Sequence, residues 1–276
     1  MTTEATVARP SPALSRARRS VRFQRFGVAK GITGALTTAS LLVPAELLLR
    51  GVAGRDKVRF RRLFHTSLSR ALGIRIIVHG AAARRRRVLF VSNHVSWADV
   101  PVLGAKLRAA FVAKSEVSGW GLVGWLATLA RTVYVDRERR QSIGDQRNAI
   151  GERLAAGENV ILFPEGTNSD GTHVLPFKSS LFALADGVDD VLIQPVTIAY
   201  THVNGIRVTR ERLPDLAWIG DTELFPHALA FMALGKVRAE ILFHPAVRAS
   251  DFADRKALAR HCENAVSEGY RRLMRG

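Results

Sequence analysis

The segment VLFVSNHVSWAD, residues 88–99, joins an apolar run to a polar turn and then to a stretch of helical character. The run VLFVS (88–92) predicts a strand that is buried on both faces, and SWADVPVLGAKL (96–107) predicts a helix. In parallel α/β sheets the functional side chains gather where strands end and helices begin. The turn between these two elements therefore makes His94 and Asp99 candidate functional residues.

His94 and Asp99 are five positions apart, which is close enough for their side chains to meet across a strand-to-helix turn. A carboxylate beside a neutral imidazole fixes the tautomer of the ring and stabilises its protonated form, as a general base requires. A second interpretation is structural, because Ser96-Trp97-Ala98-Asp99 also fits a helix capping box with Asp99 at the third helical position. The spacing alone leaves both interpretations open.

Strand and helix patterns alternate on both sides of this segment. Residues 63–80 predict a helix that runs into a short strand. Further strands are expected at 109–114, 131–136, 159–166, 191–200 and 237–247, and further helices at 121–130, 139–157, 177–187 and 251–275. Alternating strands and helices predict an α/β fold whose mostly parallel sheet is flanked by helices.

A second strand end also carries polar side chains. The strand in ILFPEGTNSDGTHVLPFKSS (161–180) breaks at a proline, after which Glu165, Gly166 and Thr167 provide a carboxylate, a flexible backbone and a hydroxyl. Lys178 follows in the same stretch. An ordinary polar turn between strand and helix explains this pattern equally well, so the segment indicates little by itself.

The charge of the chain is concentrated at one end. The 276 residues carry 41 Lys+Arg and 24 Asp+Glu, a formal net charge of +17, and residues 1–90 hold 19 of the basic and 3 of the acidic residues. A nucleic-acid-binding domain is expected to carry its basic patch on the folded core, whereas residues 91–276 are close to neutral. The distribution favours an anionic membrane surface over nucleic acid as the partner.

An apolar segment, GITGALTTASLLVPAELLL (31–49), lies within this basic region. Its 19 residues are long enough to span a bilayer, but Pro44, Glu46 and the basic residues on both sides argue against a span, because basic flanks stay on the cytoplasmic side. We expect a helical interfacial anchor or monotopic hairpin on the cytoplasmic face of the cell membrane, with a single span or a buried core helix as alternatives. The expected domains are a basic tail and anchor over residues 1–64 and an α/β domain over residues 65–276.

Composition and motifs exclude several other classes of protein. With 47% hydrophobic and 24% charged residues the chain has the composition of a folded protein, and the single cysteine, Cys262, excludes an internal disulfide and a Cys-rich zinc module. The eight histidines are scattered without ligand spacing, so no metal site is expected. GWGLVG (119–124) matches a dinucleotide-binding pattern but lacks the acidic residue that should follow about twenty positions later.

Four blocks follow one another along the chain: NHVSWAD (93–99), YVDR (134–137), FPEGTNS (163–169) and IQPVTI (193–198). Together they resemble the glycerophospholipid acyltransferase family, which includes the 1-acylglycerol-3-phosphate O-acyltransferases. The resemblance implies a membrane-attached α/β enzyme that transfers a fatty acyl group to a lysolipid hydroxyl. The implied acyl donor is acyl-coenzyme A or acyl carrier protein, and no other cofactor is expected.

The resemblance also implies roles for individual residues. His94 would deprotonate the acceptor hydroxyl and Asp99 would orient it. The acceptor head group would lie beside the third block and the arginine of the second block, because an arginine can bind a phosphate through two hydrogen bonds. The predicted substrate-binding residues are Arg137, Glu165, Gly166, Thr167 and Lys178.

Two departures from the family pattern bear on the acceptor. The family often has arginine after Glu-Gly-Thr, where this chain has Asn168, and often has glycine six positions before the second-block arginine, where this chain has Arg131. The expected acceptor is 1-acylglycerol-3-phosphate, which would give phosphatidic acid. Lyso-ornithine lipid, whose acceptor hydroxyl lies on an acyl chain and whose head group is zwitterionic, is the alternative within the family. A non-catalytic membrane-anchored or nucleic-acid-binding protein is the alternative from another class.

Overall fold

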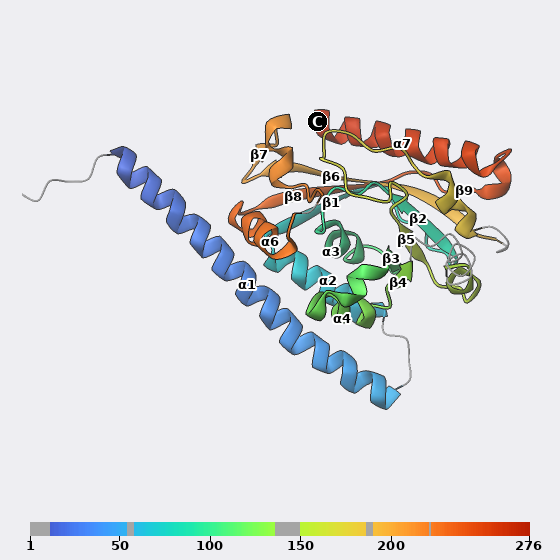
Figure 1. Cartoon of the computed structure of the whole chain (residues 1–276), viewed down its shortest axis with the longest axis horizontal. Helices are drawn as coiled ribbons and strands as arrows, with labels where there is room; N and C mark the ends of the chain where they lie inside the picture. The colour runs from blue at the N-terminus through green and yellow to red at the C-terminus, as the bar shows by residue number, and fades with distance from the viewer. Residues whose placement is uncertain (1–11, 54–57, 136–149, 186–189, 221) are drawn as a thin grey trace, which may run out of the picture.

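A computed structural model describes residues 12–53, 58–135, 150–185, 190–220 and 222–276 of the chain (Figure 1). Its centre is a sheet whose strands lie, in spatial order, as β1 (Ile74–His79), β8 (Val237–Phe243), β6 (Leu192–Val203), β2 (Val88–Ser92), β5 (Val160–Leu162), β3 (Ala110–Lys114) and β4 (Val133–Val135). Every neighbouring pair in this order is parallel except β6 and β8. Two short strands, β7 (Ile206–Arg207) and β9 (Val247–Arg248), pair antiparallel with β6. The predicted α/β fold with a mostly parallel sheet is confirmed.

The α-helices are α1 (Pro12–Ala53), α2 (Val58–Ala71), α3 (Asp99–Gly104), α4 (Gly121–Leu129), α6 (Leu224–Ala233) and α7 (Arg255–Arg275). Helices cover both faces of the sheet, with α7 on one face and α2, α3 and α6 on the other (Figure 1). Residues 150–155, within the stretch 139–157 where a helix was expected, are helical as well. The 3₁₀ helices are η1 (Ser115–Gly119), η2 (Ser179–Ala185), η3 (Arg210–Asp215) and η4 (Ala249–Asp251).

Strand β2 lies in the middle of the sheet and is buried along its whole length. Its side chains alternate between two hydrophobic clusters, with Phe90 packed in the cluster on the α3 and α6 side and with Leu89 and Val91 packed on the α7 side. This alternation is the physical basis of the continuous apolar run VLFVS. The end of the strand is therefore fixed from both faces, and it carries the candidate site.

Three elements differ from the sequence expectation. The helix expected at 96–107 is shorter, because the first residues form a turn whose backbone N–H groups bond to the carboxylate of Asp99. The helix expected at 177–187 is a 3₁₀ helix over Ser179–Ala185. Helix α6 was not predicted, because LFPHALAFMA is apolar on all sides and shows no helical period.

The apolar segment 31–49 forms part of one continuous helix, α1, in which Pro44 is accommodated. The segment therefore does not fold back on itself between residues 31 and 49, as a hairpin within it would require. By length and composition, Arg25–Leu48 is the one helix among the described residues that can cross a membrane, and only 17% of its apolar core is buried in the protein. This low burial argues against a soluble core helix.

Helix α1 rests against the folded domain through small residues. Gly34 lies against Ala71 at the end of α2, and Gly31 lies against Met232 of α6, where a Cβ atom would approach the Met232 sulfur to 2.4 Å. The expected domain boundary between residues 64 and 65 lies inside α2. The division into two domains stays a prediction.

Candidate active site

The candidate site lies in the turn that joins β2 to α3. Asn93 fixes the start of this turn, because its side-chain amide donates to the carbonyl of Ile198 and accepts from the Ile198 N–H, each at 2.9 Å. The carbonyl of His94 accepts a hydrogen bond from the N–H of Ser169 at 2.8 Å. The turn is therefore held by β6 on one side and by the segment that follows β5 on the other.

The carboxylate of Asp99 is fully buried and accepts four hydrogen bonds. Its Oδ2 atom accepts from His94 Nδ1 at 2.7 Å and from the backbone N–H groups of Val95 and Ser96 at 2.7 and 2.9 Å. Its Oδ1 atom accepts from the hydroxyl of Tyr200 at 2.7 Å. One carboxylate thus closes the turn before α3 and holds the imidazole. The full capping box does not form, because α3 begins at Asp99 and the Ser96 hydroxyl is buried without a hydrogen-bond partner.

The imidazole of His94 is held between a carboxylate and an aromatic ring. It stacks on Phe163, with ring centroids 3.9 Å apart and an interplanar angle of 12°. Because Nδ1–H donates its hydrogen bond to Asp99, Nε2 is the ring nitrogen left to act on a substrate. With 17% of its side chain exposed, His94 can reach a bound hydroxyl while staying oriented. This is the arrangement of a general base.

Glu165 lies in the interior of the protein. It is 2% exposed, and its Oε1 accepts from the backbone N–H of His94 at 3.0 Å, while its Oε2 is buried without a hydrogen-bond partner. Burial raises the pKa of Glu165 to about 8, although the hydrogen bonds from the N–H groups of His94 and Leu175 oppose this shift. The predicted role of Glu165 in binding the lysolipid head group stays a prediction, and in the structure its carboxyl group supports the backbone of His94 from within.

His94 opens into an apolar cavity of about 910 Å³. Its walls come from α1, α2, α4 and α6, and Gly166, Thr167 and Asn168 lie beside His94 in its lining. Gly166 has a φ of 75°, a conformation that glycine adopts without strain. The cavity has the size and chemical character of a site for a lipid chain with one reactive polar end.

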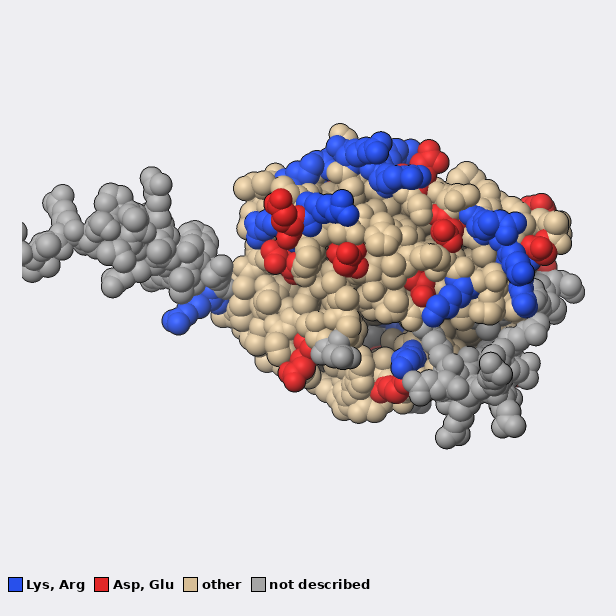
Figure 2. Space-filling view, turned by 45° about the horizontal axis from the view of Figure 1, so that its top comes forward, with Lys and Arg blue, Asp and Glu red and all other residues tan. Residues whose placement is uncertain are grey.

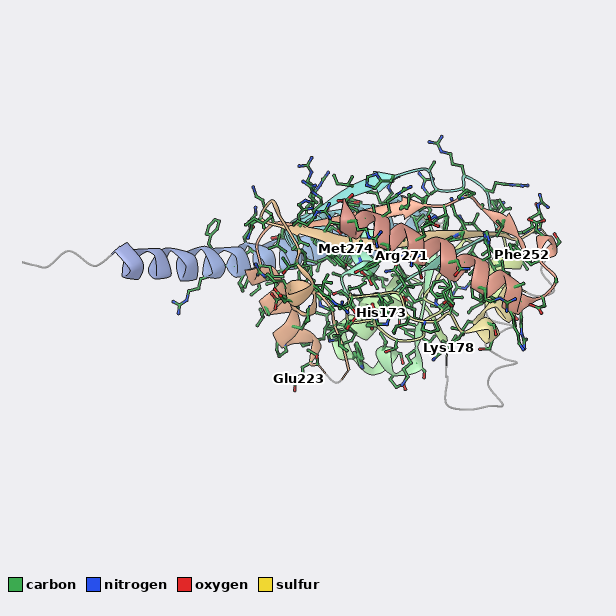
Figure 3. The ribbon with its side chains drawn as sticks, turned by 90° about the horizontal axis from the view of Figure 1, so that it is seen from above. His173, Lys178, Glu223, Phe252, Arg271 and Met274 are labelled. Carbon is green, nitrogen blue, oxygen red and sulfur yellow. The ribbon has the colours of Figure 1, made fainter. Side chains whose placement is uncertain are left out.

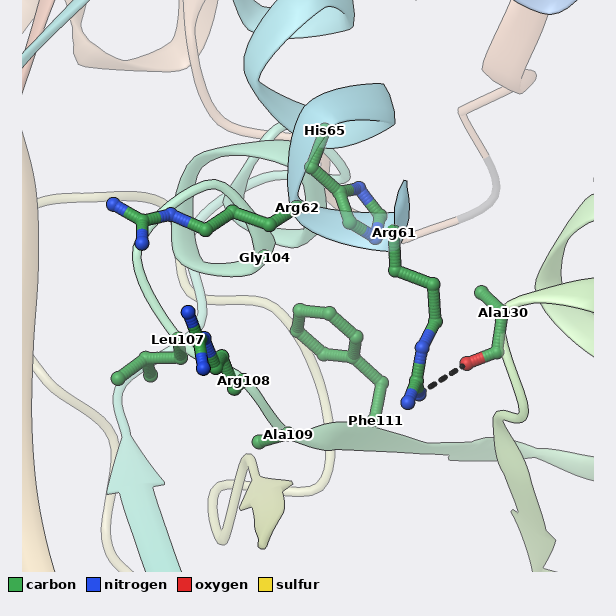
Figure 4. Close-up of a pocket in the computed structure, with 9 residues that line it drawn as sticks. All are labelled: Arg61, Arg62, His65, Gly104, Leu107, Arg108, Ala109, Phe111 and Ala130. Atoms are coloured by element: carbon green, nitrogen blue, oxygen red, sulfur yellow. Dashed lines mark hydrogen bonds between the residues drawn. The ribbon is translucent and has the colours of Figure 1, made fainter. Parts of the chain in front are cut away.

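A separate small pocket lies beside α2 (Figure 4), and Arg61, His65, Phe111 and Ala130 line both this pocket and the cavity. Arg61 donates to the carbonyl of Ala130 at 3.2 Å, and the ring of His65 packs against Gly104, where a side chain would leave no room for it. Burial, together with the charge of Arg61, lowers the pKa of His65 to about 4, so this histidine is neutral at pH 7.

Comparison with known proteins shows the family. The family model described as "Acyltransferase" matches residues 75–199. A lyso-ornithine lipid O-acyltransferase of Brucella abortus is 41% identical over 242 residues, which cover 85% of this chain and 91% of that protein. The chain belongs to the acyltransferase family.

Of two other relatives of this acyltransferase, one has the same name as the Brucella abortus protein and one is named for another acceptor. A lyso-ornithine lipid O-acyltransferase of Rhizobium meliloti is 40% identical and covers 80% of this chain and 77% of that protein. A 1-acyl-sn-glycerol-3-phosphate acyltransferase of Neisseria gonorrhoeae is 33% identical and covers 65% of this chain and 68% of that protein. The crystal structure of the 1-acyl-sn-glycerophosphate acyltransferase PlsC from Thermotoga maritima has the same fold, with a TM-score of 0.63 at 21% identity over 94% of this chain and 97% of that one.

The remaining predicted binding residues of the acyltransferase do not all meet at the cavity. Gly166 and Thr167 line it. Lys178 is exposed near α7 (Figure 3) and lies outside the cavity lining. Arg137 lies outside the described residues.

Arg131 does not supply a head-group charge to the cavity. It forms an ion pair with Glu158, with Nη2 and Oε1 2.8 Å apart, and it is not part of the cavity lining. Its φ is 64°, which is a conformation that favours glycine. Glycine adopts such a positive φ without strain, which explains why the family often has glycine at this position.

Sequence reasoning missed two residues of the site. Tyr200 supports Asp99 and Phe163 supports the imidazole of His94, although they come from β6 and from the end of β5. Burial, and secondarily the charge of Asp99, raises the pKa of Tyr200 well above its ordinary value, so its hydroxyl remains a donor. Only the parallel order of the strands could have indicated that these side chains meet.

Proposed function

We propose that this acyltransferase transfers a fatty acyl group to the hydroxyl of lyso-ornithine lipid at a membrane surface, with His94 as the general base and Asp99 as its orienting partner. The 2.7 Å contact between His94 Nδ1 and Asp99 Oδ2, at the wall of an apolar cavity, supports these roles. We further propose that the cavity receives an acyl chain and that Gly166 and Thr167 lie beside the acceptor.

The acceptor assignment is carried by the similarity to the lyso-ornithine lipid O-acyltransferase of Brucella abortus, which extends over 91% of that protein. The chemistry of the cavity supports it. Asn168 lines the cavity where the family often has an arginine, and its side-chain amide nitrogen is buried without a hydrogen-bond partner. A neutral amide lacks the paired donors and the charge with which arginine binds a phosphate monoester.

In the proposed reaction, Nε2 of His94 takes the proton of the acceptor hydroxyl as the oxygen attacks the thioester carbonyl of the donor. A carbon–oxygen bond forms, and the carbon–sulfur bond then breaks. The leaving thiolate takes the proton back from His94, so the products are the ester and a free thiol. Positioned base catalysis contributes about 10²–10⁴-fold, and the cavity contributes by holding thioester and hydroxyl together. The donor is acyl-coenzyme A or acyl carrier protein in this proposal.

The membrane attachment is assigned to α1. Its apolar part, Arg25–Leu48, is mostly uncovered by the folded domain, and the basic residues of the first ninety positions are suited to the anionic lipids of the cytoplasmic leaflet. Figure 2 shows a further band of lysine and arginine, with acidic side chains between them, along the top of the molecule, and this band is not assigned to the attachment through α1. A lipid acceptor would reach the site from this membrane.

The test is an acyl-transfer assay of the full-length protein with radiolabelled acyl donors, supplied as acyl-coenzyme A and as acyl carrier protein. Each donor is combined with lyso-ornithine lipid and, separately, with 1-acylglycerol-3-phosphate. We expect product from lyso-ornithine lipid that the His94→Ala variant does not form. Transfer to neither acceptor would refute the proposed reaction.

Transfer mainly to 1-acylglycerol-3-phosphate is the second candidate function. The 33% identity to the Neisseria gonorrhoeae enzyme favours it. That result would refute the lyso-ornithine lipid assignment while leaving the roles of His94 and Asp99 in place.

A further inference from the structure

The exposed apolar side chains of this protein gather on one part of its surface. Within the described ranges, fifteen large hydrophobic side chains are exposed, and thirteen of them lie on α1, on α2, at α4, or on α6 and the loop before it. The two exceptions are Val78 and Ile206. Scattered exposed apolar residues need no explanation, but a contiguous patch marks an interaction site.

We propose that α4 and α6 enter the lipid bilayer beside α1, so that the mouth of the cavity opens directly into the membrane. This inference rests on the proposed membrane attachment through α1 and extends it to the catalytic domain itself. We name the outward side chains of α4 and α6 the second membrane contact, and they are Leu122, Trp125, Phe225 and Leu229.

Helix α4 is apolar on both sides and contains no charged residue. Its inner side chains Val123 and Leu126 line the cavity, while Leu122 and Trp125 on its outer side are 64% and 46% exposed. A helix that is hydrophobic all round is normally covered by protein or by lipid. No described part of the chain covers the outer side of α4, which is therefore available to lipid.

Helix α6 also carries apolar side chains that line the cavity and are exposed. Phe231 is buried in the core, whereas Phe225 and Leu229 line the cavity and are also 70% and 44% exposed. Ile32 and Leu36 of α1 line the same cavity and are exposed as well. Exposed apolar side chains of α1 and α6 therefore line the same cavity.

Lipid is the occupant that this surface favours. The apolar stretch of α1 is longer than a globular partner usually covers and has the length of a bilayer core. Trp120 and Trp218 pack edge to face at the rim of the cavity, and tryptophan is enriched where proteins meet the membrane–water interface. Neither α4 nor α6 offers a charged residue that would pair with a protein partner.

The first experiment places an environment-sensitive fluorophore on single new cysteines. Because Cys262 is buried and burial raises the pKa of its thiol to about 12, a maleimide reacts at the new position only. The full-length variants are Leu122→Cys and Phe225→Cys in the second membrane contact, Leu41→Cys on α1, and Ile206→Cys as the control. Ile206 is 74% exposed in β7, which lies on the far side of the molecule from α4 (Figure 1).

Each labelled protein is mixed with vesicles of phosphatidylcholine and phosphatidylglycerol that carry a nitroxide quencher on the acyl chains. We expect fluorophores at 122 and 225 to be quenched to within about twofold of the fluorophore at 41, and the fluorophore at 206 to be unaffected. Quenching at 41 without quenching at 122 and 225 would overturn the second membrane contact alone. Quenching at none of these positions would overturn the anchoring through α1 as well.

A functional measurement separates lipid from a protein occupant. The double variant Leu122→Ser/Trp125→Ser should lose at least tenfold in rate on acceptor embedded in vesicles and keep its rate on the same acceptor in detergent micelles. Ile206→Ser should keep both rates. A fluorophore at 122 that responds to protein concentration in detergent, but not to vesicles, would identify a second copy of the chain and overturn the proposal.

Discussion

The hydroxyl of Tyr200 lies 2.7 Å from Oδ1 of Asp99, while the imidazole of His94 lies 2.7 Å from Oδ2 of the same carboxylate. One buried carboxylate thus joins a residue of the central strand β6 to the residue that faces the cavity. The two oxygens have separate partners, so the side chain cannot rotate without breaking a hydrogen bond on each side. The orientation of His94 is set by the core of the protein.

Tyr200→Phe should lower kcat about tenfold and leave KM nearly unchanged. The change removes one donor to a buried carboxylate, an interaction of about 1.5–3 kcal/mol, without altering the surface of the cavity. Initial rates at several acceptor concentrations measure both constants. Tyr270→Phe is the matched control, because the Tyr270 hydroxyl donates to the carbonyl of Gly171 and does not touch Asp99. Equal kcat values for the Tyr200→Phe variant and the unaltered enzyme would contradict this role of Tyr200.

Asp99→Asn should reduce kcat by about 10²-fold or more and should also lower the melting temperature. The amide presents an N–H group where the carboxylate accepts, so either His94 or the turn before α3 loses its partner. His94→Ala should reduce kcat to a similar extent with a much smaller loss of stability. Thermal unfolding and kinetics on the two variants test this difference, and equal melting temperatures would count against the double role of Asp99.

Asn168→Arg should shift the acceptor preference toward 1-acylglycerol-3-phosphate. An arginine at this position of the cavity lining would provide a charge and a pair of donors for a phosphate. We expect the ratio of kcat/KM for 1-acylglycerol-3-phosphate to that for lyso-ornithine lipid to rise at least tenfold. Asn168→Gln retains the amide and is the control. An unchanged ratio would show that the phosphate is recognised elsewhere.

Glu165 should make the protein less stable as the pH rises. Its pKa is about 8 in the folded protein and near 4.5 in the unfolded chain, so the folded state holds the additional proton between these values. The contribution of Glu165 to the free energy of unfolding should therefore be greatest below about pH 4.5, fall as the pH rises toward 8, and stay constant above that pH. The loss is at most roughly 5 kcal/mol.

The Glu165→Gln variant isolates this contribution, because glutamine keeps the shape of the side chain and does not titrate. Chemical denaturation at pH 5, 7 and 9 should show a smaller decrease for the variant than for the unaltered protein. Parallel pH profiles would mean that Glu165 is charged in the folded state.

Much of the sheet could be predicted from the sequence, because its central strands are short apolar runs separated by turns. VLFVS and the run at 191–200 are buried on both faces, and such strands leave a clear signal even without alternation. Helix α6 gave no such signal, since it is apolar toward both the core and the cavity mouth. A helix that faces two apolar environments has no polar side to mark its period.

The site was predicted in part. His94 and Asp99 lie in one turn, so local spacing was sufficient to predict their contact. Glu165 was assigned to the substrate through the family resemblance, and the sequence did not indicate its burial, which accompanies a hydrogen bond to a backbone 71 positions away. Tyr200 lies on β6, and the order of strands that brings it to Asp99 is a property of the whole sheet.

The four donors on Asp99 have a consequence for how this chain can change over time. A descendant that no longer transfers acyl groups could discard His94, which faces the cavity and supports little else. It could not discard Asp99 as readily, because two backbone N–H groups and Tyr200 would lose their acceptor inside the core. An aspartate retained without its histidine would therefore be the mark of a former enzyme, and would be no sign of remaining activity.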